Sequence, residues 1–165
     1  MRSFPQIHRV LVRALPLLVV ACASAGPGRD VPGDLVFLEC DQMLGTAHAT
    51  AEVTDQGDVL RVRGNSLTLP PGAVRGRERF ELRSRAGRHV GVDILPRSYQ
   101  FGSSATITLS WARCGSLPPG FTPVVVEVEH GKARANQVLQ STVNMEDSTV
   151  SAQIEHLTGY LIGGT

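Results

Sequence analysis

The sequence predicts an all-β protein, a single antiparallel β-sandwich of about ten short strands. Three observations lead to this fold class. Apolar and polar residues alternate in short stretches, as they do in strands that bury one face. Turn-forming residues interrupt these stretches about every 8–12 residues, which is typical of sandwich domains. Beyond residue 21, no window shows the helical apolar period of about 3.6 residues.

The composition agrees with a folded domain. Apolar residues make up 42 % and charged residues 19 % of the 165-residue chain, the balance of a globular protein rather than a disordered one. The net charge of +1 includes three arginines within residues 1–21, which contain no acidic residue. Without that segment the charge is −2, so the domain has no global electrostatic attraction to nucleic acid.

The first 21 residues have the features of an export signal. The three arginines precede an apolar run over residues 14–21, which is much too short to span a bilayer. This run leads into VVAC at residues 19–22, which resembles the bacterial lipobox. The resemblance implies cleavage before Cys22, a diacylglycerol on its sulfur and usually an acyl chain on the new amino group. The alternative is an ordinary secretory signal that is cleaved near residues 21–25.

This interpretation divides the chain into a signal peptide (1–21), a flexible tether (22–33) and a β-sandwich domain (34–165). The start of the tether is rich in Ala, Gly and Ser, which gives a flexible linker. Each buried CH₂ contributes ~0.8 kcal/mol, so two or three acyl chains on Cys22 would anchor the protein stably. Ala23 follows the cysteine, which resembles lipoproteins sent to the outer membrane. We therefore expect an outer-membrane location, facing the periplasm or the cell surface.

The strands are predicted from alternation and from the turn residues that bound them. They cover residues 35–40, 49–54, 59–63, 66–69, 79–84, 89–95, 105–112, 123–129, 138–143, 149–154 and 157–162. Residues 41–45 are predicted as a loop. The polar segment Asp55–Asp58 contains a glycine and predicts a hairpin turn between its two flanking strands.

The clearest strand and turn lie in Ser66–Val74, which has the sequence SLTLPPGAV. Its two leucines alternate with hydroxyl residues, as in a half-buried strand. Pro70 and Pro71 then end the strand, because proline has no amide hydrogen to donate to the sheet. Pro71 followed by Gly72 predicts a type II turn in which the glycine takes a positive φ.

The cysteines predict one disulfide bond. Lipidation of Cys22 leaves Cys40 and Cys114, which can pair in an oxidising compartment. Closing a loop of ~75 residues would add about 4 kcal/mol in the chain-entropy model. The alternatives are two buried free thiols or, without lipidation, a pairing that involves Cys22. The chain contains no Cys-x-x-Cys, so neither redox catalysis nor a cysteine-built zinc site is expected.

Three segments resemble the ZU-five domain, which ankyrins, zonula occludens proteins and netrin receptors share and to which some bacterial exported proteins are related. Ser66–Val74 resembles its L-x-I-P-P-G-A-L/I segment, and Val92–Phe101 resembles its P-x-G-x-x-F segment with Ser98 in place of the glycine. Residues 156–162, HLTGYLI, look like the H-F-S-x-Y-A-V ending of the bacterial relatives. The resemblance covers residues 49–162 and implies a β-sandwich that acts in interaction or scaffolding. It transfers no ligand residues.

Residues His156, Leu157 and Thr158 also match a self-cleaving His-Leu/Phe-Ser/Thr tripeptide of eukaryotic ZU-five relatives and of an unrelated domain of adhesion receptors. That match implies His156 as the base, Thr158 as the nucleophile and a cut between Leu157 and Thr158. The chemistry also needs a strained peptide bond. The structural alternative is that His156 satisfies a backbone carbonyl and shares a strand face with Thr158.

A second candidate site is a cluster of arginines that could bind an anionic envelope polymer. The cluster consists of Arg75, Arg77, Arg79, Arg83, Arg85 and Arg88. The alternative is a solvated hairpin whose outer charges discourage edge-to-edge pairing. The five histidines are scattered and show no metal-ligand spacing, and the chain has no nucleotide-binding or hydrolase motif, so no metal, cofactor or nucleic acid is expected.

Taken together, the sequence predicts a membrane-anchored exported lipoprotein with a structural or protein-interaction role at the bacterial cell envelope. It predicts no enzyme that acts on an external substrate. The membrane would be reached through the lipid on Cys22, and the partner would be an envelope protein or an anionic polymer. Self-cleavage at Thr158 and binding of an anionic polymer are the two alternative functions.

Overall fold

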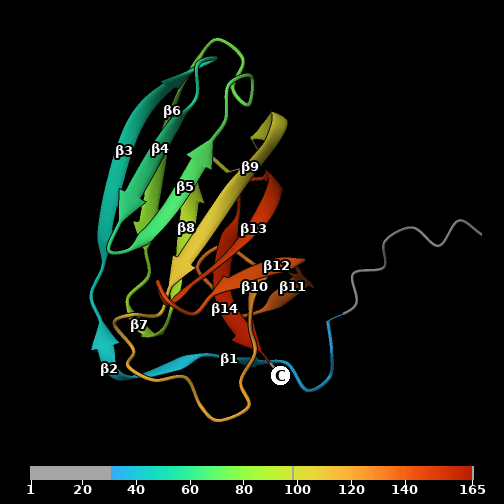
Figure 1. Ribbon diagram of the computed structural model, residues 1–165. Coiled ribbons are helices and arrows are strands. Elements are labelled where there is room, and N and C mark those ends of the chain that lie inside the picture. Colours follow the sequence, from blue (N-terminus) through green and yellow to red (C-terminus); the bar gives the residue numbers. More distant parts are fainter. Residues whose placement is uncertain (1–30, 98, 165) are drawn as a thin grey trace, which may run out of the picture.

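Fourteen strands and no helix make up the described part of this computed structural model, which covers residues 31–97 and 99–164 (Figure 1). In chain order the strands are β1 Val36–Phe37, β2 Glu39–Leu44, β3 Ala47–Thr54, β4 Asp58–Val62, β5 Asn65–Leu69, β6 Arg77–Ser84, β7 Gly87–His89, β8 Gly91–Leu95, β9 Gln100–Ser110, β10 Pro123–Val128, β11 Ala135–Val138, β12 Ser141–Asn144, β13 Thr149–His156 and β14 Gly159–Gly164.

Two antiparallel sheets form the layers of a sandwich (Figure 1). The seven-stranded sheet has the order β11-β10-β14-β8-β6-β3, and β1 also pairs with β14. The five-stranded sheet has the order β12-β13-β9-β5-β4. The short strands β2 and β7 pair separately. The predicted all-β antiparallel sandwich is therefore confirmed.

The alternating apolar residues meet between the two sheets. Leu67 and Ile107 come from the five-stranded sheet, Phe80 and Ile94 come from the seven-stranded sheet, and each has 0 % of its surface exposed. A second apolar cluster of Val126, Val128 and Leu161 lies on the other face of the seven-stranded sheet. It packs against the N-terminal segment around β1, so β14 is buried along its whole length.

The Pro-Pro-Gly turn is formed as predicted. Gly72 has a φ of 80°, and the Ala73 amide donates a hydrogen bond of 3.0 Å to the Pro70 carbonyl. The Gly72 amide also donates to the Asp55 carbonyl at 2.7 Å, and the Gly102 amide donates to the Ala73 carbonyl at 2.9 Å. The turn thus connects the end of β5 to the β3–β4 connection and to the start of β9.

The predicted hairpin at Asp55–Asp58 is wrong. This segment joins β3 of the seven-stranded sheet to β4 of the five-stranded sheet, so it crosses between layers. Gly57 lies so close to the end of β5 that an added Cβ would be 2.3 Å from the Leu69 carbonyl oxygen. Strands on either side of a crossover alternate as hairpin strands do, so alternation does not distinguish the two connections.

Other predicted boundaries are also wrong, and two of them have a clear structural cause. Most of the loop predicted over residues 41–45 belongs to β2. The pairing of β2 with β7 is irregular, so buried and exposed residues do not alternate along it and the sequence shows no strand pattern. The single strand predicted over residues 138–143 is two strands in different sheets, β11 and β12. Ser141 stabilises the crossing between them, because its hydroxyl accepts the Val125 amide at 2.8 Å and donates to the Leu139 carbonyl at 2.8 Å.

Candidate functional site

The predicted disulfide bond joins Cys40 of β2 to Cys114, which follows β9. Both cysteines are buried, with 1 % and 8 % of their surface exposed. The bond closes a sequence separation of 74 residues and holds the small β2–β7 pair against the end of β9. Cys22, the predicted lipidation site, lies outside the described residues, and its lipidation stays a prediction.

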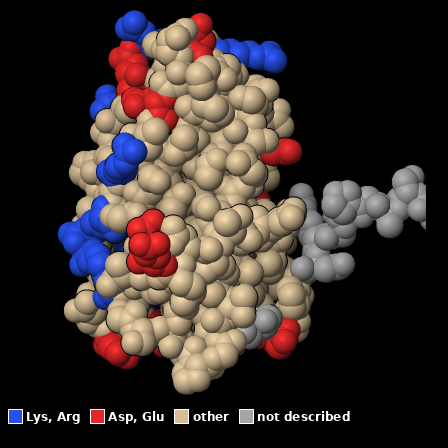
Figure 2. All heavy atoms as spheres, viewed as in Figure 1, with Lys and Arg blue, Asp and Glu red and all other residues tan. Residues whose placement is uncertain are grey.

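Most of the predicted arginine cluster is neutralised by carboxylates of the same chain. Four ion pairs involve it: Arg77–Glu52 at 2.9 Å, Arg83–Glu81 at 2.8 Å, Arg85–Asp93 at 2.5 Å and Arg88–Glu39 at 4.0 Å. Figure 2 shows basic and acidic side chains together on the left of the molecule, over β3 and β6. This mixed charge favours the interpretation of a solvated face, and binding of an anionic polymer there stays a prediction.

Arg85 is not part of that exposed face. Only 11 % of its side chain and 10 % of that of Asp93 are exposed. Arg85 also donates to the Lys132 carbonyl at 2.7 Å, and Asp93 accepts the Gly131 amide at 3.1 Å. The pair passes over Gly159, where a Cβ would lie 2.2 Å from Arg85 Nη2. It therefore fastens the turn between β10 and β11 to β8 and to the segment that follows β6.

His130 extends this buried polar cluster. Its Nδ1 lies 3.1 Å from Arg97 Nη2 and 3.9 Å from Asp93 Oδ1. Burial lowers the pKa of His130, and Asp93 opposes that effect. A neutral imidazole fits the geometry, because its Nδ1 can then accept the hydrogen bond from Arg97.

The candidate self-cleaving tripeptide lies where the chain crosses from β13 to β14 and thus from one sheet to the other. His156 Nε2 is 3.0 Å from Glu127 Oε2, whereas the Thr158 hydroxyl donates to the Val128 carbonyl at 3.0 Å. Leu157 is buried in the core. Within the described residues, no hydrogen bond joins His156 to Thr158. These contacts offer no support for self-cleavage, which stays an untested hypothesis.

A longer polar groove runs past His156. Three neighbouring hollows have volumes of about 310, 470 and 290 Å³. The second hollow shares lining residues with the first and with the third. Gln137, Leu139 and Gln153 line the first two, and Ser104, Glu155 and His156 line the last two. We call this continuous surface the polar groove. It follows the open side of the sandwich between β9–β13 and β10–β11.

The polar groove has a distinct chemistry. Its lining side chains are mostly amides and hydroxyls, with the carboxylates of Glu127 and Glu155, and it has no lysine or arginine. At its centre the Tyr160 hydroxyl donates to the His156 carbonyl at 2.7 Å, and burial raises the pKa of Tyr160. Sequence reasoning missed the groove, because its residues come from separate strands and form no motif.

Neither a metal centre nor a membrane-spanning helix is found in the part of the chain that the structure describes. Residues 31–97 and 99–164 contain no group of three or more His, Cys, Asp or Glu side chains that could hold a metal ion. They also contain no helix long and apolar enough to cross a membrane. No protein-family model matches the chain, and a comparison with curated proteins found no match.

Proposed function

We propose that this chain is a lipid-anchored envelope lipoprotein whose β-sandwich binds another envelope protein along the polar groove. The observation that carries the proposal is the groove itself, an open and continuous surface of amide and hydroxyl side chains. Such groups bind the polar atoms of an extended chain through hydrogen bonds. The resemblance to ZU-five domains supports the same class of function, because those domains act in interaction and scaffolding.

The charge of the groove favours one kind of partner. Glu127 and Glu155 are its acidic side chains and it has no lysine or arginine, so it complements a neutral or basic segment better than an anionic polymer. Figure 2 agrees, because the surface over β9, β12 and β13 is largely free of Lys and Arg. An extended polypeptide segment of an envelope protein is therefore the proposed ligand.

Site-specific photocrosslinking in cells tests the groove. A photoreactive residue replaces the exposed Gln140 in the groove or, as the control, the exposed Thr50 on β3. We expect a discrete protein adduct from position 140 and none from position 50. Equal adducts from both positions, or none from position 140, would contradict binding at the groove.

The mass of the intact, unreduced protein tests the anchor. Protein purified from bacterial membranes should carry the mass of acyl chains on Cys22. It should also lack two hydrogen atoms, which Cys40 and Cys114 lose when they form the disulfide. Cys22→Ser should lose both the acyl mass and the membrane fractionation. A parent protein without lipid would contradict the lipoprotein, and loss of the last eight residues would instead support cleavage before Thr158.

A further inference from the structure

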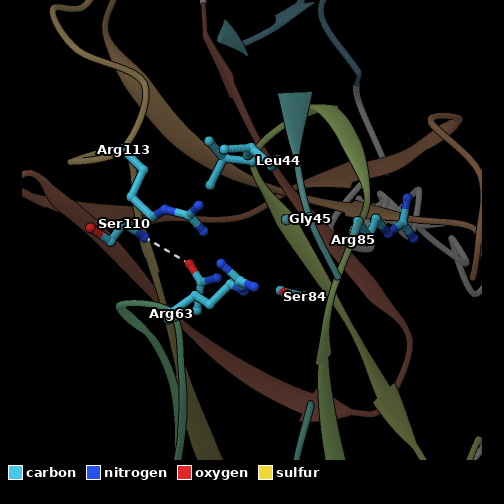
Figure 3. A pocket seen from close by; sticks show the side chains of 10 residues that line it. Leu44, Gly45, Arg63, Ser84, Arg85, Ser110 and Arg113 are labelled. Atoms are coloured by element: carbon cyan, nitrogen blue, oxygen red, sulfur yellow. Dashed lines mark hydrogen bonds between the residues drawn. The ribbon is translucent and has the colours of Figure 1, made fainter. Parts of the chain in front are cut away.

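We propose that Arg63 and Arg113 form a binding site for a single phosphoryl group. Both line a small hollow of about 20 Å³ at one end of the sandwich, together with Leu44, Gly45 and Ser110. Figure 3 shows their guanidinium groups extending into the same space beside Gly45. An added Cβ at Gly45 would lie 3.7 Å from Arg63 Nη2, so this guanidinium lies directly over the glycine.

The two guanidinium groups have no countercharge in the part of the chain that the structure describes. Within residues 31–97 and 99–164, neither Arg63 nor Arg113 forms an ion pair. Over the same residues, Arg63 forms one side-chain hydrogen bond, a long contact of 3.4 Å to the Thr46 carbonyl. Arg85 also lines the hollow, but its guanidinium extends away toward Asp93 (Figure 3). Two uncompensated cations that face one hollow repel each other, and a bound anion would remove that repulsion.

The backbone at Arg63 provides an independent reason to expect a function. Val62 pairs with Asn65, so Arg63 and Gly64 form the whole turn between β4 and β5. Their φ angles are 50° and 85°, as in a type I′ turn. Asn, Asp and Gly are preferred at the first of these positions. Other residues are strained there, because the left-handed backbone brings Cβ too close to the following carbonyl oxygen, and only Asn and Asp offset this by local hydrogen bonds. Strained residues of this kind concentrate at functional sites.

The backbone of the turn that carries Arg63 is held against β9. The buried Asn65 side chain accepts the Ser110 amide at 2.9 Å. Gly64 packs against Ser110 so closely that a Cβ would lie 3.1 Å from the serine Cβ. The backbone at Arg63 is therefore fixed against β9, whose end leads to Arg113. Two guanidinium forks at one hollow are suited to bind an oxyanion.

The size and charge of the hollow identify the ligand class. A volume of about 20 Å³ holds roughly one water-sized group. One oxygen of a phosphoryl group would fit inside, while the others would bind Arg63 and Arg113 at the open mouth, where both residues are exposed. A dianionic phosphomonoester matches two guanidinium charges better than a single carboxylate does. The group could belong to a soluble phosphate ester or to a lipid headgroup.

Calorimetric titration of the full-length protein with inorganic phosphate, at constant ionic strength, tests this site. We expect saturable one-to-one binding that Arg113→Gln weakens by about tenfold or more. Arg61→Gln is the matched control, because it removes the same charge from an exposed position outside the hollow. The absence of saturable binding to the parent protein, or an equal loss in Arg61→Gln, would overturn the proposal.

A second variant separates binding from folding. Arg63→Asn suits the positive φ of the turn, so it should keep or raise the melting temperature while phosphate affinity falls by about tenfold or more. Unchanged phosphate affinity in this variant would overturn the role of Arg63.

Titration with soluble dihexanoyl phosphatidic acid then distinguishes the two sources of the phosphoryl group, a lipid headgroup and a soluble phosphate ester. Tighter binding than that of phosphate assigns a lipid headgroup, and weaker binding assigns a soluble phosphate ester.

Discussion

At the scale of single residues, the buried ion pair of Arg85 and Asp93 is held on several sides. Its two side chains are about nine-tenths buried, and Gly159 leaves the space in which they meet. A buried charge is costly to leave without a partner, whereas an exposed ion pair contributes little. The pair at Arg77 and Glu52 provides the contrast, because both of its side chains are more than half exposed.

Removal of Asp93 should therefore be far more damaging than removal of Glu52. We expect Asp93→Ala to lower the free energy of unfolding by about 3–5 kcal/mol, because the Arg85 charge stays buried without a partner. Glu52→Ala is the control and should cost about 1 kcal/mol or less. Urea unfolding of both variants measures the difference. Similar losses for the two variants would show that the Arg85–Asp93 pair is not buried in solution.

At the scale of elements, the β10–β11 hairpin depends on groups outside its own strands. Arg85 and Asp93 contact its turn at Lys132 and Gly131, and His130 lies beside them. The second apolar cluster joins β10 of the same hairpin to β14. A change in the charge of His130 therefore acts on the turn that is fastened to β8 and to the segment after β6.

The titration of His130 gives a pH prediction with a defined sign. Burial lowers its folded pKa below the ordinary 6.5, and Arg97, Arg85 and Arg83 add to this, while Asp93 opposes it. Between the two pKa values the unfolded chain binds more protons than the folded chain. The free energy of unfolding should therefore decrease as the pH falls below about 6.5, the pKa of His130 in the unfolded chain. The decrease ends once the pH is below the pKa of His130 in the folded protein.

Urea unfolding at pH 7.5 and 5.5 checks this effect. The parent protein should lose more stability over this interval than His130→Gln, which keeps a polar side chain but does not titrate. Glu129 also has a lowered pKa, but it affects stability only below its ordinary pKa of 4.5, which is outside the interval from pH 7.5 to 5.5. An identical pH dependence of the two proteins would contradict a buried neutral His130.

The same scale shows why the sequence predicts some elements and misses others. Alternation located most strands, because strands such as β5 and β9 bury one face against the core. It could not tell that Asp55–Asp58 crosses between sheets, since that depends on which strands β3 and β4 pair with. Arg85 resembled its exposed neighbours in sequence. Its burial depends on Asp93 of the next long strand, β8, and no sequence pattern indicated that these two residues pair.

At the scale of the whole molecule, the chain ends define an orientation. Val36 of β1 pairs with Gly164, so the N-terminal segment meets the C-terminal strand at one end of the sandwich (Figure 1). In the proposed anchored state, a tether before β1 would start from this end. The disulfide between Cys40 and Cys114 was predicted from cysteine counting and the expected export, whereas the polar groove and the Arg63–Arg113 hollow required the arrangement of the strands.

The disulfide connects this end of the molecule to the body, and its removal is the last prediction. The closed loop of 74 residues contains every strand from β3 to β9, so the cross-link restricts a large part of the unfolded chain. We expect the double variant Cys40→Ala with Cys114→Ala to lose about 2–5 kcal/mol of unfolding free energy. Urea unfolding with and without a reducing agent provides the control. Reduction should lower the stability of the parent protein and leave the double variant unchanged, whereas a parent protein insensitive to reduction would mean that the two thiols are free in solution.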